Sequence, residues 1–348
     1  MHVPCLKVKT ELKNGEYHMR SAALALLLLP VASTSFVAPP VAPVSIEEWT
    51  VPWAKTRPRD PFVDKQGRVW FVGQEGNYVA YLTPANGQFK RYEIDAGTNP
   101  HNLIVADDGM VWYSGNRNGR ICRLDPATGK VTTYMMPDKA VRDPHTLTFD
   151  KTGNIWFTAQ GANYVGHLVT KTGEIHLIKS PTSGSRPYGI VIDPKNRPWF
   201  VEFGTNKLAM IDAASMKIVE HTLPDSKTHP RRIAVTSDGM IWWGDYTQSK
   251  LGRFNPNTKE TKEWAMPSGG MSLPYAMTSD DKDRVWLVET GVQPNRLVGF
   301  DPKSESWFSI TPVSKSGGGT IRHMIFHKPT RTIWFGTDAN TIGRATVP

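Results

Sequence analysis

A tryptophan recurs at nearly even intervals along this chain, and the repeat limits the folds open to it more than any other feature. Intervals of 42 to 48 residues separate its seven copies, which are Trp70, Trp112, Trp156, Trp199, Trp242, Trp286 and Trp334. In most copies the order along the chain is a proline-containing turn, an apolar run and then the tryptophan. Asp-Gly, Thr-Gly and Asn-Gly pairs separate the runs. Such pairs suit the positive φ angles of tight hairpins, so each repeat predicts four short antiparallel strands.

Seven units of about 43 residues predict an all-β, seven-bladed β-propeller, in which each unit forms one blade. The last unit ends after its third strand, at 341–344. A matching fourth strand, 46–52, stands before the first unit, because its sequence resembles the fourth strands 219–224 and 262–267. Pairing of this N-terminal strand with the last blade closes the ring and covers both sheet edges. The alternative, an open β-sandwich array, would leave 46–52 without a partner.

The N-terminal segment 1–35 has the three-part layout of a secretory signal peptide. Basic residues precede an apolar run at 22–31, and small residues follow at 32–35. The apolar run is shorter than the about 20 residues that a membrane span needs. We therefore predict export to the periplasm or the exterior, with cleavage favoured over retention as an uncleaved membrane anchor.

The domain boundaries follow from the same division. We expect a signal peptide region at 1–35, a lead-in rich in proline and alanine at 36–44, and one propeller domain at 45–348. Met19 offers a second start of translation, which would remove 1–18 from the protein. Neither a second domain nor a linker is predicted.

Charge and cysteine content narrow the classes of partner. The formal net charge of +9 comes from scattered lysines and arginines, which argues against nucleic-acid binding and mildly favours anionic ligands. Of the two cysteines, Cys5 lies in the signal region and Cys122 is left single, so we expect no internal disulfide in the mature domain. We expect a monomer without a membrane span that takes a small-molecule or cyclic peptide substrate.

The first strand of every propeller blade lines the central channel, so the turn before it places side chains at the channel mouth. The residue after the turn proline, eleven before the tryptophan, is never apolar in this chain. The predicted ring consists of Arg59, His101, His145, Tyr188, Arg231, Tyr275 and, because of an insertion, either Arg322 or His323. Together with the adjacent Arg232, this ring predicts a polar funnel that binds substrate.

A second ring lies three residues after each tryptophan and carries carboxylates in three consecutive blades, at Glu202, Asp245 and Glu289. Two interpretations stay open. The carboxylates could contact a ligand, with Glu202 and Glu289 binding substrate, or they could form a structural network with Arg231, Arg232 and Tyr275.

Blades two and three carry the group with the clearest chemistry. We expect His101, Asp143 and His145 to face one another across these two blades. Two imidazoles and a carboxylate are the residue types that remove a proton or hold a hard cation.

Several motifs resemble those of the streptogramin B lyase family. They are Arg186-Pro-Tyr-Gly-Ile190, Ile155-Trp-Phe-Thr158, Gly161-Ala-Asn-Tyr-Val-Gly166 and Asp338-Ala-Asn-Thr-Ile-Gly343, and the likeness extends from about Ile46 to Arg344. The resemblance implies a seven-bladed propeller that opens a cyclic depsipeptide antibiotic at its ester by β-elimination, with Mg²⁺ as cofactor, and hence a role in antibiotic resistance.

The resemblance also implies roles for individual residues. His145 is then the general base, His101 contacts substrate or metal, Asp143 binds or supports the metal, and Gln160 stands where the family has a further glutamate ligand. The family also has glutamate at the position of Asp143 and places its site on the last two blades. Loss of an anionic ligand at Gln160 weakens Mg²⁺ binding, because hard cations prefer charged oxygens.

Two other functions stay open. A periplasmic lactone hydrolase uses a related scaffold, although the acidic calcium-binding cluster of such enzymes is not evident in this sequence. A propeller without catalysis would bind an anionic small molecule, glycan or peptide through Arg59, Arg231, Arg232 and Arg322. Metal dependence and an unsaturated product distinguish the lyase from the binding protein.

Overall fold

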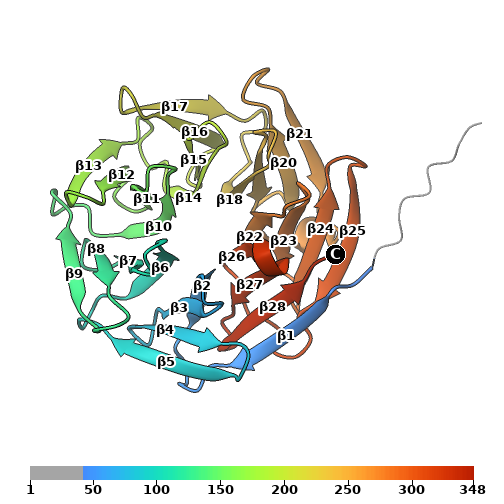
Figure 1. The fold of residues 1–348 in the computed structure, drawn as a ribbon. Helices are drawn as coiled ribbons and strands as arrows, with labels where there is room; N and C mark the ends of the chain where they lie inside the picture. Colours follow the sequence, from blue (N-terminus) through green and yellow to red (C-terminus); the bar gives the residue numbers. More distant parts are fainter. Residues whose placement is uncertain (1–41) are drawn as a thin grey trace, which may run out of the picture. The chain divides into compact units, whose positions relative to one another are not determined.

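A computed structural model describes residues 42–348, and the predicted signal peptide and most of the lead-in lie outside these described residues. Strands β1 to β28 and two short 3₁₀ helices, η1 (Gly269–Met271) and η2 (Lys328–Thr330), make up the regular structure of the described part. Figure 1 shows the strands gathered into sheets that stand around a common axis. None of the described helices is long and apolar enough to cross a membrane.

Seven four-stranded antiparallel sheets form the blades. Their innermost strands are β2 (Pro58–Val63), β6 (Pro100–Val105), β10 (Pro144–Phe149), β14 (Pro187–Ile192), β18 (Pro230–Val235), β22 (Pro274–Ser279) and β26 (Met324–His327). The second strands are β3 (Val69–Gly73), β7 (Val111–Gly115), β11 (Ile155–Ala159), β15 (Pro198–Glu202), β19 (Ile241–Asp245), β23 (Val285–Glu289) and β27 (Thr332–Gly336). The third strands are β4 (Tyr78–Thr83), β8 (Arg120–Leu124), β12 (Tyr164–Val169), β16 (Lys207–Asp212), β20 (Lys250–Phe254), β24 (Arg296–Asp301) and β28 (Thr341–Thr346). The outer strands are β5 (Gln88–Glu93), β9 (Val131–Met135), β13 (Glu174–Lys179), β17 (Lys217–Thr222), β21 (Thr261–Ala265), β25 (Ser306–Pro312) and β1 (Ser45–Thr50).

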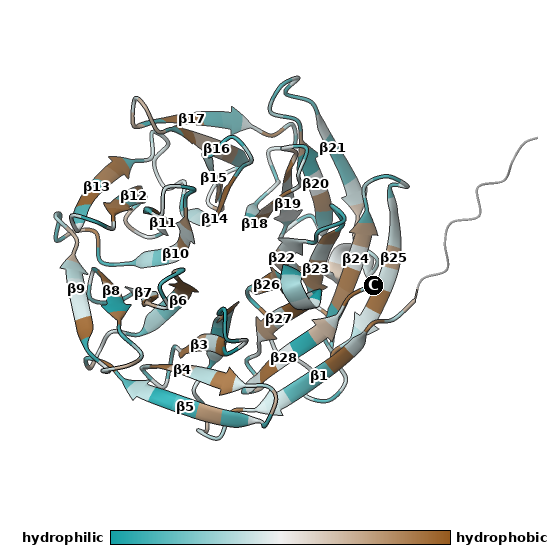
Figure 2. Ribbon diagram, in the orientation of Figure 1, coloured by the Kyte–Doolittle hydropathy of each residue, from teal (hydrophilic) through white to brown (hydrophobic). Residues whose placement is uncertain are grey.

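Burial differs between the second and the outer strands of a blade. Every residue of the seven second strands is buried, because neighbouring blades cover both faces of the sheet at this radius. Outer strands such as β5 and β17 alternate between exposed and partly buried residues, and Figure 2 shows hydrophilic residues along them. The hydrophobic core therefore lies between blades and surrounds the axis.

Closure of the ring depends on β1, which pairs with β28 from Ser45 opposite Thr346 to Thr50 opposite Thr341. The buried carboxylate of Glu48 fixes this pairing, because it accepts hydrogen bonds from Thr341 Oγ1 at 2.9 Å and from the Ser316 backbone N–H at 3.1 Å. The predicted seven-bladed propeller, closed by an N-terminal strand, is therefore confirmed, and the open array is excluded.

An aspartate six residues before the tryptophan anchors four of the seven repeats, and the sequence analysis did not predict this role. The indole Nε1–H donates to the carboxylate over 2.7 to 3.2 Å in each of the pairs Trp70–Asp64, Trp156–Asp150, Trp199–Asp193 and Trp286–Asp280. Asp193 also accepts the backbone N–H groups of Lys195 and Arg197, both at 2.9 Å. Each such carboxylate therefore ties the turn after an inner strand to the core between blades.

Asp193→Ala should lower the free energy of unfolding by about 2–4 kcal/mol, because it leaves the buried Trp199 Nε1–H without an acceptor. Asp212 provides a matched control in the same blade, since its carboxylate accepts hydrogen bonds only within its own surface turn. Asp212→Ala should cost less than about 1 kcal/mol. Denaturant unfolding of both variants measures the difference, and equal losses would contradict the anchoring role of Asp193.

Candidate functional site

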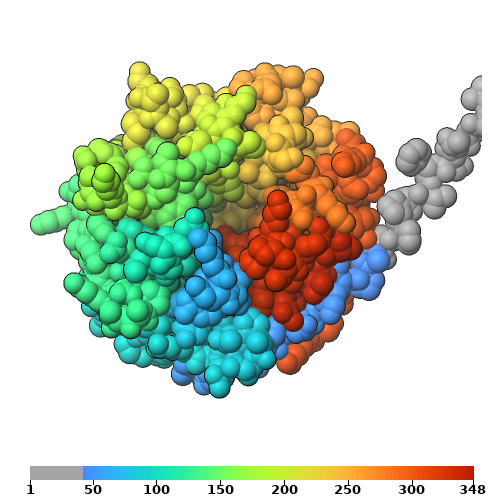
Figure 3. All heavy atoms as spheres, viewed as in Figure 1, coloured from blue at the N-terminus to red at the C-terminus, as the bar shows by residue number. Residues whose placement is uncertain are grey.

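A bulge near the start of six of the seven inner strands positions the candidate site. In β6, pairing with β7 begins at Pro100 and resumes at Leu103, so His101 and Asn102 lie outside the regular ladder. Equivalent interruptions occur in β2, β10, β14, β18 and β22. A bulge bends the strand and re-aims its side chains, so two adjacent residues of one strand can both reach the axis. Figure 3 shows the molecule hollowed where the blades meet.

Three members of the predicted ring form a row on blades two to four. The ring centroids of His101 and His145 lie 3.6 Å apart, and 4.3 Å separates the centroids of His145 and Tyr188. All three side chains are at most 5% exposed. The structure therefore brings these predicted residues together at the axis, as a nearly buried layer.

Two further members of the ring continue this layer on blades five and six. The Tyr188 and Tyr275 hydroxyls share a hydrogen bond. Arg231 stacks its guanidinium on the Tyr275 ring, 3.7 Å from the centroid, and its Nη2 donates to the Tyr275 hydroxyl at 3.0 Å. Unlike Tyr188 and Tyr275, Arg231 is partly exposed and thus reaches solvent at the channel mouth.

One carboxylate faces two guanidinium groups on the axis. Asp60 accepts a hydrogen bond from Arg59 Nε at 3.0 Å, and Arg232 Nη2 approaches its Oδ2 to 3.7 Å. Asn102 Nδ2 donates to the same oxygen at 3.0 Å. These four side chains are at most 5% exposed, so one positive charge is left in excess in a buried position. The sequence analysis did not predict Asp60 and Asn102 as axial residues. Each directly follows a residue of the predicted ring, and in a strand without a bulge its side chain would point away from the axis.

Burial and this positive charge keep the axial histidines neutral. Burial lowers the pKa of His101 well below its usual range, and Arg59 and His145 lower it further. Burial, Arg232 and Arg59 lower the pKa of His145 in the same way. Burial also lowers the pKa of His323, to about 4. These imidazoles therefore hold an unprotonated nitrogen at neutral pH.

The pKa values of the two axial tyrosines, Tyr188 and Tyr275, shift in opposite directions. Burial and the neighbouring Tyr188 raise the pKa of Tyr275. Burial acts on Tyr188 in the same direction, but the combined charge of Arg231, Arg232 and Arg59 outweighs it and lowers the pKa of Tyr188. Tyr275 therefore holds its proton more firmly than Tyr188 does at neutral pH.

Asp143 does not join the histidines. Its carboxylate accepts hydrogen bonds from the backbone N–H groups of Gly161 and Ala162, the latter at 3.2 Å. It makes no ion pair or hydrogen bond with His101 or His145, so direct contacts join only the two histidines of the expected group. These N–H groups belong to the turn between β11 and β12, and the sequence gives no sign that they take up the carboxylate.

The predicted Mg²⁺ does not fit the described donors. Residues 42–348 contain no group of three or more His, Cys, Asp or Glu side chains placed to hold a metal ion. Gln160 is neutral, Asp143 caps a turn, and Asp60 is engaged by Arg59. Magnesium needs oxygen ligands around it, and a surplus of buried arginine charge opposes a dication.

The second ring has structural contacts. Glu202 Oε1 accepts a hydrogen bond from Ser180 Oγ at 2.6 Å. Glu289 accepts from the Ser268 backbone N–H at 2.7 Å and from Arg296 Nε at 2.9 Å. Asp245 accepts the backbone N–H groups of its own turn and of the preceding loop. All three carboxylates are fully buried and hold loops in place, but the expected network with Arg231, Arg232 and Tyr275 does not form.

The last blade supplies two residues with different surroundings. Arg322 pairs with Asp338, and the backbone carbonyl of Arg322 accepts a hydrogen bond from Arg232 Nε at 2.9 Å. His323 and Arg232 line a cavity farther along the channel, which none of the mouth residues reaches. The predicted funnel residues thus divide into a mouth group of Arg59, His101, His145, Tyr188, Arg231, Tyr275 and Arg322 and a deeper pair of Arg232 and His323.

Comparison with known proteins agrees with the resemblance predicted from the motifs. Residues 95–348 match the Virginiamycin B lyase family. No curated protein sequence matches the chain significantly.

Solved structures share the fold. Virginiamycin B lyase from Staphylococcus aureus superimposes with a TM-score of 0.79 at 24% identity, over 87% of this chain and 99% of that chain. A catalytically inactive variant of the same enzyme with quinupristin gives a TM-score of 0.78 at 24% identity, over 87% and 99% of the two chains. The extracellular domain of a putative one-component system from Bacteroides thetaiotaomicron gives a TM-score of 0.67 at 16% identity, over 87% of this chain and 42% of that chain. At these identities the likeness establishes the architecture and leaves the chemistry to the site.

Stability should fall as the pH decreases from 7 to 5, because buried histidines gain protons in the unfolded chain first. The pKa of His323 is about 4 in the folded protein and about 6.5 in the unfolded chain. The contribution of His323 to the loss of unfolding free energy therefore begins near pH 6.5 and is complete near pH 4. At pH 5, His323→Gln should reduce the slope of unfolding free energy against pH by about 1 kcal/mol per pH unit. Urea unfolding between pH 7 and 5 measures the slopes, and equal slopes for wild type and His323→Gln would contradict the prediction.

Proposed function

Because this chain belongs to the virginiamycin B lyase family, we propose that it is a carbon–oxygen lyase that opens an ester or lactone linkage of a cyclic depsipeptide-like substrate. The reaction removes a proton from the carbon next to a carbonyl and breaks the C–O bond at the adjacent carbon. A carbon–carbon double bond forms, and a carboxylate leaves. The observation that supports this proposal is the contact between two uncharged imidazoles, His101 and His145, beside a surplus of arginine charge.

His145 serves as the base. Its Nδ1 lies 2.9 Å from Thr146 Oγ1, and Arg232 Nη1 donates to the same hydroxyl oxygen at 3.1 Å. With the ring proton on Nδ1 and donated to Thr146, the lone pair on Nε2 is free to accept the substrate proton. His101 packs against the ring and orients it.

Arginine and tyrosine stabilise the negative charge that develops on the substrate carbonyl oxygen. Arg231 is partly exposed at the mouth, and the neighbouring Tyr275 keeps its proton because burial raises its pKa. Both groups are donors fixed before the substrate arrives, which is the arrangement that lowers the barrier to enolate formation. Arg59, Tyr188 and Arg322 complete the substrate contacts at the mouth.

Export is part of the proposal. The signal-like pattern of 1–35 supports it, and the fold recurs in an extracellular domain of a bacterial one-component system. Streptogramin-type antibiotics would meet such an enzyme before they enter the cytoplasm.

A second candidate function is binding of an anionic small molecule, glycan or peptide without turnover. The excess of Arg59, Arg231 and Arg232 over the single carboxylate of Asp60 favours it. Product analysis separates the candidates: a lyase leaves a new double bond, a lactone hydrolase adds water without one, and a binding protein leaves the ligand intact.

His145→Gln should lower turnover of a streptogramin B substrate by about 10²-fold or more, because the amide cannot accept the proton. The measurement is the rate at which ring-opened, unsaturated product appears in mass spectra. His176→Gln, at a histidine of outer strand β13, should keep the wild-type rate. A His145→Gln variant with unchanged turnover would rule out His145 as the base, and wild-type protein without unsaturated product would refute the lyase.

Turnover should persist in excess EDTA, because arginine charge and the tyrosine hydroxyl donor stabilise the negative charge, a role that the family resemblance assigns to Mg²⁺. The rate before and after chelation, and after addition of MgCl₂, tests this. If EDTA abolishes turnover and Mg²⁺ restores it, the predicted metal is required and the arginine mechanism is refuted.

A further inference from the structure

The central channel contains a cavity of about 220 Å³ that the proposed lyase chemistry does not use. All seven inner strands contribute to its walls, which include the apolar side chains of Leu103, Leu147, Ile190, Ile233, Met277 and Met324. Lining residues near the carboxyl ends of these strands, such as Val191, Thr278 and Ile325, are partly exposed, so the cavity opens to solvent at that end. Sites for drug-sized ligands occupy about 300–1,000 Å³, so this cavity suits a smaller molecule.

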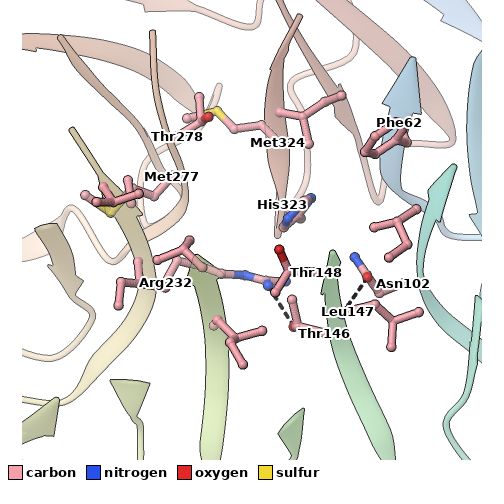
Figure 4. A pocket seen from close by; sticks show the side chains of 18 of the residues that line it. Phe62, Asn102, Thr146, Leu147, Thr148, Arg232, Met277, Thr278, His323 and Met324 are labelled. Carbon is pink, nitrogen blue, oxygen red and sulfur yellow. Dashed lines mark hydrogen bonds between the residues drawn. The ribbon is translucent and has the colours of Figure 1, made fainter. Parts of the chain in front are cut away.

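The inner end of the cavity is polar and carries unused donors. Figure 4 shows Arg232 reaching toward the middle of the cavity, where His323 also lies. Arg232 is 2% exposed and uses Nη1 and Nε in hydrogen bonds to Thr146 and to the Arg322 carbonyl. Within residues 42–348, its Nη2 and the Nδ1 of His323 have no hydrogen-bond partner. A guanidinium donor buried without a partner is costly, so it points to a ligand that completes the set.

Charge identifies the class of ligand. Asp60 Oδ2 lies 3.7 Å from Arg232 Nη2, which is beyond hydrogen-bonding distance, and Arg59 holds the other oxygen of this carboxylate at 3.0 Å. The site therefore keeps one uncompensated positive charge at the end of an apolar tube. An anionic head group would compensate this charge and accept from both free donors, while a short apolar chain would cover the walls.

We propose that the channel cavity binds a small monocarboxylate with an unbranched apolar chain of a few carbons. Its carboxylate accepts hydrogen bonds from Arg232 Nη2 and, in the tautomer with a proton on this nitrogen, from His323 Nδ1. Its chain lies along Leu103, Ile233 and Met277 and points to the open end of the channel.

This site is separate from the mouth. His101, His145, Tyr188 and Tyr275 form a layer at most 5% exposed, and none of them lines the cavity. A carboxylate in the cavity thus enters from the opposite end of the channel. The proposal does not require lyase activity, and its test is binding rather than turnover.

Isothermal titration of the full-length protein with hexanoate tests the site, with hexan-1-ol as the uncharged probe of equal chain length. We expect saturable binding of hexanoate and affinity for hexan-1-ol at least about tenfold weaker. Arg232→Gln should weaken hexanoate binding at least about tenfold and change hexan-1-ol binding little, because it removes the charge and keeps the walls. Circular dichroism establishes that each variant is folded.

Thr278→Phe provides a second test that leaves Arg232 in place. The larger side chain narrows the open end of the cavity and should weaken both probes, while Arg231→Gln at the mouth should leave hexanoate affinity unchanged. Absence of saturable hexanoate binding to wild type would refute the proposal, and so would equal hexanoate affinity in wild type and a folded Thr278→Phe variant. Loss of binding in Arg231→Gln alone would place the anion at the mouth and also refute it.

Discussion

Pairing of β1 with β28 is the interaction on which every axial contact depends. It completes the seventh blade and makes seven inner strands face one axis. Arg232 of the fifth blade then reaches Asp60 of the first blade, Thr146 of the third and the Arg322 carbonyl of the seventh. An open array of the same blades could not bring these partners together. The buried polar layer in turn gives the closed ring a specific geometry, because each polar group needs its partner from another blade.

The blades could be predicted because a propeller repeats one hydrophobic pattern in each blade. The tryptophan spacing gave the number of sheets, and the residue after each turn proline located the ring, including the contact between His101 and His145. Asp60 and Asn102 escaped prediction because strand alternation turns neighbouring side chains to opposite faces, and the bulge cancels this rule locally. A polar residue directly after the ring residue is the sequence feature that could have indicated a second side chain at the axis. Arg232, which follows Arg231, is the clearest example of it.

The carboxylates could not be assigned from the sequence, because their partners are backbone and hydroxyl groups with no side-chain signature. Asp143 accepts hydrogen bonds from N–H groups of a turn, and Glu202 accepts one from a serine of another loop. Each lies within a few residues of the predicted site, so spacing alone places it there. The need of buried backbone N–H groups for a hydrogen-bond partner decides between the two roles. Pairing such a group with a carboxylate avoids the free-energy cost of an unpaired buried donor, whereas a ligand in solution already has water as its partner.

The same electrostatic arrangement gives the two ends of the channel different chemistry. A surplus of buried arginine charge depresses the basicity of His145, yet it also stabilises an enolate or a carboxylate that forms within reach. On the mouth side, Arg231 presents a positive charge and Tyr275 a neutral hydroxyl near an unprotonated imidazole, which suits proton removal from a carbon acid. On the cavity side, Arg232 presents a positive charge at the end of an apolar tube that the histidine row does not reach, which suits binding without reaction. One buried layer can therefore separate a reactive face from a binding face. At the bulge of β18 the adjacent residues Arg231 and Arg232 both reach the axis, where Arg231 stacks on Tyr275 and Arg232 lines the cavity.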